Sequence, residues 1–112
     1  MELEQMILQC TNDSYRWFPN PVTHTPQNQT LCLAGEVGEV ANIVKKVVRG
    51  SMTIGEAIAG VGLKEPLPME IIDCLVYLCN LMGLAEFQDV DWEAIWKQKR
   101  AYNELRFGDT SE

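Results

Sequence analysis

Apolar side chains recur at helical spacing in four segments of this chain, and no segment shows the alternation of a β-strand. In residues 2–15 they follow the i, i+3, i+4 pattern that is typical of a helix facing a core. Two prolines and an asparagine then interrupt the pattern, which predicts a loop over residues 16–25 that contains Trp17. The chain is therefore expected to begin with a helix and a loop.

Start and stop signals delimit the second helix. Thr25 suits the N-cap position, Pro26 suits the first helical position, and Gly50 follows the apolar pattern. Glycine ends helices well because it adopts a left-handed backbone at little cost. These signals predict a helix over residues 26–49.

Three more helices are expected beyond this point. The longest of them is apolar almost all round, which is typical of a helix in the middle of a bundle or at a subunit interface. A glycine-rich connection over residues 51–65 precedes it. The three are a short helix over residues 54–59 capped by Thr53, a helix from Pro66 or Pro68 to Gly83, and a helix from Asp89 or Asp91 to about Leu105.

These elements predict one all-α domain over residues 1–112, built as a four-helix bundle with a frayed tail over residues 108–112. A bundle of this size covers only one side of its most apolar helix. If Asp73 faces inward, we expect Val76 and Leu78 on the opposite side, where they need a second apolar surface. The sequence therefore predicts a homo-oligomer, at least a dimer, with a two-fold interface.

Composition and charge exclude several classes of protein. The net charge of −7 argues against a general nucleic-acid binder, because such proteins are normally basic. The longest apolar run, residues 71–85, contains Asp73 and Asn80 and is too short to span a bilayer. The amino terminus lacks the basic region of a signal peptide, and the four cysteines show no C-x-x-C pair. We expect a cytoplasmic protein with reduced cysteines and no contact with membranes.

Two acidic pairs stand in the most apolar helices. Glu36 and Glu39 lie three positions apart in one predicted helix, and Glu70 and Asp73 do so in the next long one. Residues at this spacing share a helix face. A single pair of this kind is most often a solvated face, but a carboxylate among apolar neighbours costs several kcal/mol unless something compensates it. A cation shared by all four carboxylates would compensate them.

The type of ligand indicates which cation fits. Four carboxylates with no histidine at metal-binding spacing favour Mg²⁺, with Mn²⁺ as the alternative. Mg²⁺ commonly completes its coordination shell with substrate phosphates. The sequence therefore predicts a magnesium site used for phosphoryl or pyrophosphoryl chemistry.

The last predicted helix carries the opposite charge. Lys99, Asn103 and Arg106 fall at i, i+4 and i+7 and form one stripe, which suits contact with phosphates. Lys46 lies seven positions after Glu39 and shares its helix face, so it is a further candidate for phosphate contact. A solvated basic face would produce the same two patterns.

Three motifs resemble a known family. AGEVGEV, MEIIDCLVYL and the late K-x-x-x-N-x-x-R-F are similar, over about residues 31–107, to the MazG-like branch of the all-α nucleoside triphosphate pyrophosphohydrolases. The resemblance implies that a dimer or tetramer hydrolyses a nucleoside triphosphate to the monophosphate and pyrophosphate, as housekeeping of the nucleotide pool. It implies four ligands for Mg²⁺: Glu36, Glu39, Glu70 and Asp73. It implies three contacts to phosphates or sugar: Lys99, Asn103 and Arg106.

Further roles follow from that chemistry. Glu39 is the candidate general base, because it lies between the other acids and the Lys46 side of its helix. The base pocket should be aromatic with a few polar groups, and Trp17 and His24 are candidates for it. Packing of the loop would also explain Trp17. Two other functions stay open: a phosphoribosyl-ATP pyrophosphohydrolase with the same chemistry, and a catalytically silent oligomerisation module that binds a structural cation.

Overall fold

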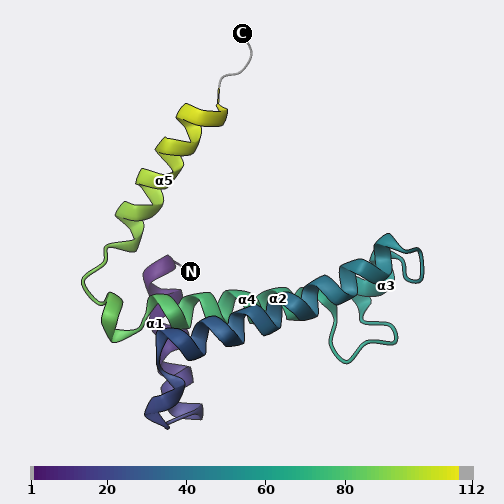
Figure 1. The fold of residues 1–112 in the computed structure, drawn as a ribbon, viewed down its shortest axis with the longest axis horizontal. Coiled ribbons are helices and arrows are strands. Elements are labelled where there is room, and N and C mark those ends of the chain that lie inside the picture. The colour runs from purple at the N-terminus through teal and green to yellow at the C-terminus, as the bar shows by residue number, and fades with distance from the viewer. Residues whose placement is uncertain (1, 109–112) are drawn as a thin grey trace.

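The computed structural model of the protein describes residues 2–108, and within that range it is all-helical, with no strand. The all-α prediction is confirmed, while the tail predicted to fray lies, from residue 109 on, outside the described residues. The elements are α1 (Leu3–Trp17), η1 (Pro21–Thr23), α2 (Pro26–Val48), α3 (Ile54–Ala59), α4 (Leu67–Met82), η2 (Ala85–Phe87) and α5 (Trp92–Phe107) (Figure 1). Across residues 2–108, no helix combines the length and the apolar character that crossing a membrane requires.

The helix ends follow the predicted signals. The side chains of Thr25, Thr53 and Asp91 each accept a hydrogen bond from the backbone amide three residues on, at 3.0–3.1 Å. Gly50, with a φ of 80°, lies just past the end of α2. Each side-chain cap stabilises its helix by about 1 kcal/mol. A few neighbouring residues therefore fix where these helices begin and end.

The end of α1 differs from the prediction. Arg16 and Trp17, predicted in a loop, form the last turn of the helix. The Arg16 guanidinium contacts the Asp13 carboxylate at 2.8 Å, three residues back, which supports the helix where the apolar pattern has stopped. Phe18 then leaves the helix, because Pro19 disfavours helical backbone in the residue before it. Trp17 is therefore held by a helix.

The packed part of the chain is an antiparallel pair of long helices, α2 and α4, which lie side by side (Figure 1). α1 crosses this pair where α2 begins and α4 ends, and α3 lies at the opposite end. Gly83 allows the close approach of α1, because a side chain there would meet Thr11 and come within 3.1 Å of Ile7. The buried core at the α3 end contains Ile43, Ala57 and Leu67.

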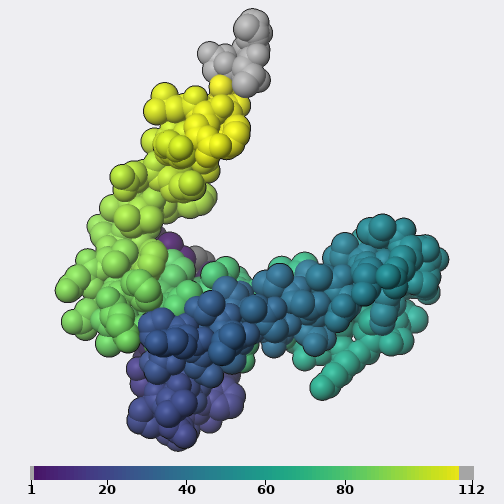
Figure 2. Space-filling view, in the orientation of Figure 1, coloured from purple at the N-terminus to yellow at the C-terminus, as the bar shows by residue number. Residues whose placement is uncertain are grey.

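α5 stands apart from this helix pair. Its first residue is anchored, because the Trp92 indole N–H donates to the Met82 carbonyl oxygen at 3.1 Å and the ring lies 5.9 Å from that of Phe87. Beyond the anchor the helix contacts α1 and extends away from α2 and α4 (Figures 1 and 2). Every side chain over residues 93–107 is exposed. Within one chain, α1, α2 and α4 therefore form the packed part.

The outer face of α4 is apolar and open. Ile71, Leu75 and Leu78 are exposed and lie at i, i+4 and i+7, on the side opposite Asp73. The prediction that Leu78 lies on this side is confirmed. The same prediction for Val76 is wrong, because residues three apart share a helix face and Val76 lines a cavity together with Asp73.

Candidate functional site

Three carboxylates converge between α2 and α4, and we call them the acidic triad. Glu36 on α2 and Glu70 and Asp73 on α4 each place an oxygen within 4.8 Å of the other two. All three side chains are half-buried. Mg²⁺ holds its oxygen ligands at about 2.0–2.1 Å, so oxygens bound to one ion lie roughly 3–4 Å apart. The triad oxygens therefore lie close to the spacing that one shared ion needs, and their all-oxygen donor set fits Mg²⁺.

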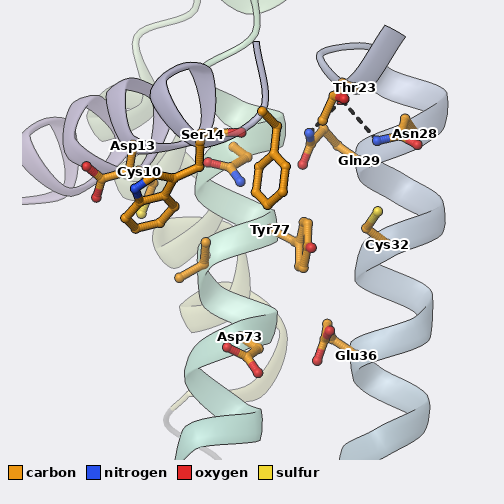
Figure 3. Close-up of a pocket in the computed structure, with 14 residues that line it drawn as sticks. Cys10, Asp13, Ser14, Thr23, Asn28, Gln29, Cys32, Glu36, Asp73 and Tyr77 are labelled. Carbon is orange, nitrogen blue, oxygen red and sulfur yellow. Dashed lines mark hydrogen bonds between the residues drawn. The ribbon is translucent and has the colours of Figure 1, made fainter. Parts of the chain in front are cut away.

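The antiparallel register of the helix pair sets this geometry. Across the space between α2 and α4, Glu36 points toward Asp73 (Figure 3). One turn further along each helix, Cys32 on α2 lies level with Tyr77 on α4 (Figure 3). Gln29 lies one further turn along α2, beyond Cys32 (Figure 3). Residues three or four apart share a helix face, so each helix presents one continuous row of side chains to the other.

Like charges crowd the acidic triad. Burial raises the pKa of Glu36 above its usual range, and the charges of neighbouring acids, Asp73 foremost, raise it further. Burial is also the largest cause that raises the pKa of Glu70, and the charge of Glu65 is the second largest. A divalent cation would replace these repulsions with attraction and hold the carboxylates in their charged form. The electrostatics of the site therefore favour a bound cation.

Two more acids lie around the triad. Glu39 is exposed on α2 and is not one of the three converging carboxylates, although its charge helps to raise the pKa of Glu36 and of Glu70. Glu65, half-buried just before α4, raises the pKa of the same two groups. Sequence reasoning missed Glu65, because it has no acidic partner three residues on. The available signal was its position directly before Pro66, at the start of the helix that carries two of the triad.

A cavity of about 530 Å³ extends from the acidic triad along α2 and α4 to α1. Glu36, Asp73 and Tyr77 line it (Figure 3). The aromatic side chains of Trp17 and Phe18 line it as well. Cavities of roughly 300–1,000 Å³ with mostly apolar walls are typical of small-molecule sites. Of the two residues predicted for a base pocket, Trp17 is one that lines this cavity.

Two buried amides also line the cavity, two helical turns from the triad. Gln29 is 1% exposed and Asn80 is 7% exposed. The side-chain nitrogen of Gln29 donates to the Thr23 carbonyl oxygen at 2.8 Å. The side-chain oxygens of Gln29 and Asn80 have no hydrogen-bond partner among residues 2–108. Both oxygens are also inaccessible to water, so a ligand in the cavity does not reach them in this arrangement of side chains.

His24, the other residue predicted for the base pocket, does not line this cavity. Its ring stacks on Tyr15, with 3.7 Å between ring centroids and 15° between planes. Its Nε2 donates to the Phe18 carbonyl oxygen at 2.6 Å. These contacts hold the connection between α1 and α2 against α1, so His24 shapes the neighbourhood of the cavity from outside.

The basic residues predicted for phosphate contact lie away from the triad within one chain. The charged groups of Lys99 and Arg106 lie 5.1 and 5.3 Å from the Tyr102 ring centroid, along α5. Asn103 is on the same helix, which extends away from α2 and α4 (Figure 1). Lys46 is exposed on α2 and forms no ion pair with any residue in the range 2–108. Contact between α5 and the triad would need a second copy of the chain.

The site thus joins two kinds of surface. The acidic triad suits a divalent cation, and the cavity beside it has aromatic walls. Such a site can bind a metal–phosphate group at one end and an organic group at the other. Comparisons with protein-family models, with curated proteins and with solved structures found no match to this chain.

Proposed function

We propose that the protein is a Mg²⁺-dependent hydrolase, with Mn²⁺ as the alternative metal, that converts a nucleoside or deoxynucleoside triphosphate to its monophosphate and pyrophosphate. The observation that carries this proposal is the convergence of three half-buried carboxylates, two of which, Glu36 and Asp73, line a cavity of about 530 Å³. The resemblance of the motifs to the MazG-like pyrophosphohydrolases supports the same reaction.

The residues around the triad have distinct roles in this reaction. The triad holds the metal, which supplies charge neutralisation for the triphosphate when bound. Glu39 is exposed beside the triad and forms no ion pair with any residue in the range 2–108, so it can accept the proton of the attacking water. The water oxygen forms a bond to the α-phosphorus, the bond from that phosphorus to the bridging oxygen breaks, and pyrophosphate leaves.

The cavity receives the nucleoside. Trp17 and Tyr77 offer aromatic surface for packing against a base or sugar. Burial raises the pKa of Tyr77 above its usual range, so its hydroxyl stays protonated at neutral pH and can donate a hydrogen bond. Tyr77 lies between the levels of Asp73 and Gln29 (Figure 3), which places it beside the sugar if the base is at the far end.

A second copy of the chain completes this site and the four-helix bundle. α5 presents a basic stripe, and its side chains over residues 93–107 are exposed. The triad and its surroundings are acidic, so charge complementarity favours α5 of one copy near the substrate phosphates of another. The assembly is a dimer or tetramer in which Lys99, Asn103 and Arg106 contact phosphates or sugar.

Substitutions in the basic stripe test that contact. Lys99→Ala and Arg106→Ala should each weaken triphosphate binding about tenfold or more, because each removes a charge-assisted hydrogen bond worth about 1.5–3 kcal/mol. Lys97→Ala is the matched control on another face of α5, where Lys97 contacts Glu93 at 3.7 Å. Titration of each variant with a triphosphate gives the affinities. Equal losses in all three variants would show a general charge effect and contradict an oriented phosphate site.

Product analysis on a panel of NTPs and dNTPs tests the function itself. With Mg²⁺ we expect the monophosphate and pyrophosphate in equal amounts, and with EDTA we expect neither. Release of inorganic phosphate in place of pyrophosphate would overturn the proposed site of cleavage. If Mg²⁺ raises the melting temperature but no nucleotide is hydrolysed, phosphoribosyl-ATP included, the protein is a structural module and the proposal is wrong.

A further inference from the structure

The cavity beside the acidic triad carries negative charge and no positive charge. Glu36 and Asp73 line it, and among residues 2–108 no lysine, arginine or histidine does. A third carboxylate that lines it, Asp13, is paired with Arg16 at 2.8 Å, so the free negative charge lies at the triad. We propose that the metal-free cavity binds an organic cation, with a primary ammonium group at the triad and an aromatic body along the cavity.

The spacing of the triad suits an ammonium group. The three oxygens of Glu36, Glu70 and Asp73 lie within 4.8 Å of one another, so a point at their centre is no more than about 2.8 Å from each. Hydrogen bonds from an ammonium nitrogen to a carboxylate oxygen measure about 2.7–2.9 Å. A primary ammonium group has three N–H donors, one for each carboxylate. The triad therefore matches this group as well as it matches Mg²⁺.

The aromatic walls indicate the body of the ligand. Tyr77 lies one helical turn from Asp73 on α4 and points into the space between α2 and α4 (Figure 3). In phenethylamine, two methylene groups place the ring centre about 5 Å from the nitrogen, close to the roughly 5.4 Å rise of one turn. The ring therefore reaches Tyr77 when the nitrogen is at the triad. Burial of the ring against aromatic walls is favourable, because it removes apolar surface from water.

An amine in this position excludes the metal. The ammonium group and Mg²⁺ need the same three carboxylates, so the two cations cannot be bound at once. A molecule of this class is therefore a competitor of Mg²⁺ and of any phosphate that the metal holds. The inference concerns the metal-free protein, and it does not depend on the reaction that the metal supports.

Calorimetric titration of the metal-free protein in an amine-free buffer tests the inference, with phenethylamine as the probe. It should bind at least tenfold tighter than phenethyl alcohol, which has the same body without the charge. It should bind tighter by a similar factor than ethylamine, which lacks the ring, and than its N,N,N-trimethyl derivative, which lacks the N–H donors. Equal affinity for phenethylamine and any of these three molecules would overturn the inference.

Competition with Mg²⁺ tests whether the amine occupies the triad. The apparent Kd of phenethylamine should rise about tenfold at a Mg²⁺ concentration nine times the Kd of the metal. Unchanged affinity in saturating Mg²⁺ would place the amine elsewhere and overturn the inference. A protein that binds phenethylamine but not Mg²⁺ would support the inference and reject the proposed metal site. Neither measurement involves turnover, so failure of the proposed hydrolysis is distinguishable from failure of the inference.

Two variants assign the two ends of the ligand. Glu36→Gln keeps the size of the side chain, removes one charge and should weaken phenethylamine binding at least tenfold. Tyr77→Leu removes an aromatic wall and should lower the ratio of phenethylamine to ethylamine affinity. Glu86→Gln and Phe107→Leu are the matched controls, because both residues are exposed outside the cavity. Wild-type affinity in Glu36→Gln, or a wild-type ratio in Tyr77→Leu, would overturn the inference.

Discussion

Glu70→Gln is expected to abolish Mg²⁺-dependent hydrolysis while leaving the fold intact. Glu70 lies in the first turn of α4 and is half-buried, and its carboxylate is one of the three that converge. The substitution keeps the size of the side chain but removes its charge, so metal affinity and turnover should fall at least a hundredfold, about the upper end of what removing a supporting residue around a metal costs. Turnover with saturating Mg²⁺ measures the loss, and circular dichroism checks the helices.

The same substitution should slightly stabilise the metal-free protein. The pKa of Glu70 is raised above its usual value of 4.5, foremost by burial. The folded state therefore binds this proton more tightly than the unfolded state, and stability falls as pH rises through the raised pKa. The Gln variant has no such loss at pH 7, so its free energy of unfolding should exceed that of wild type. The difference should be no more than about 1 kcal/mol, because the Glu70 carboxylate is half-exposed to solvent.

Thermal unfolding in EDTA at two pH values measures this effect. Wild type should approach the Glu70→Gln variant in melting temperature as the pH falls from 7 toward 4.5, since the raised pKa means that Glu70 then becomes protonated in folded wild type as well. Glu86→Gln is the matched control, because Glu86 is an exposed acid on η2. A Glu70→Gln variant that turns over nucleotide at the wild-type rate would show that Glu70 is no metal ligand. A metal-free Glu70→Gln variant that is less stable than wild type at pH 7 would contradict the destabilising effect of the Glu70 charge.

The helices and their ends were predictable because local chemistry decides them. Thr25, Thr53 and Asp91 each bond an amide three residues on, so each signal and its partner lie within one turn. The extra turn of α1 carries the Asp13–Arg16 ion pair. Such a pair supports a helical turn that has no apolar pattern. Apolar periodicity alone therefore could not predict this turn.

The site was predictable only as far as spacing within one helix decides it. The spacing predicted that Glu70 and Asp73 share a face, and they do. The meeting of Glu36 with Asp73 depends on the register of α2 against α4, which packing along the whole helix pair sets. The cavity depends on three helices at once, so neither its volume nor the paired burial of Gln29 and Asn80 could be derived from sequence patterns.

The chain is expected to form a homo-oligomer, at least a dimer, because two apolar surfaces are uncovered within one copy. On α4, the outward stripe of Ile71, Leu75 and Leu78 is exposed, with Leu78 at 42%. On α5, Ile95, Tyr102 and Leu105 are exposed on one side of the helix, with Leu105 at 87%. Contiguous apolar surface of this kind marks an interaction site in soluble proteins. Both surfaces are helical, so helix-on-helix packing across a two-fold axis would cover them.

Sedimentation at micromolar concentration checks this assembly. Wild type should sediment as a dimer or larger, well above the 12.7 kDa of one chain. Leu78→Asp and Leu105→Asp should shift it toward the monomer, because each places a charge in an apolar interface. Val48→Asp, at an exposed position at the end of α2, is the matched control and should leave the assembly unchanged. If α5 of a second copy also supplies phosphate contacts, the two dissociating variants should lose activity together with assembly. A wild-type monomer that hydrolyses nucleotide would contradict both the interface and the shared site.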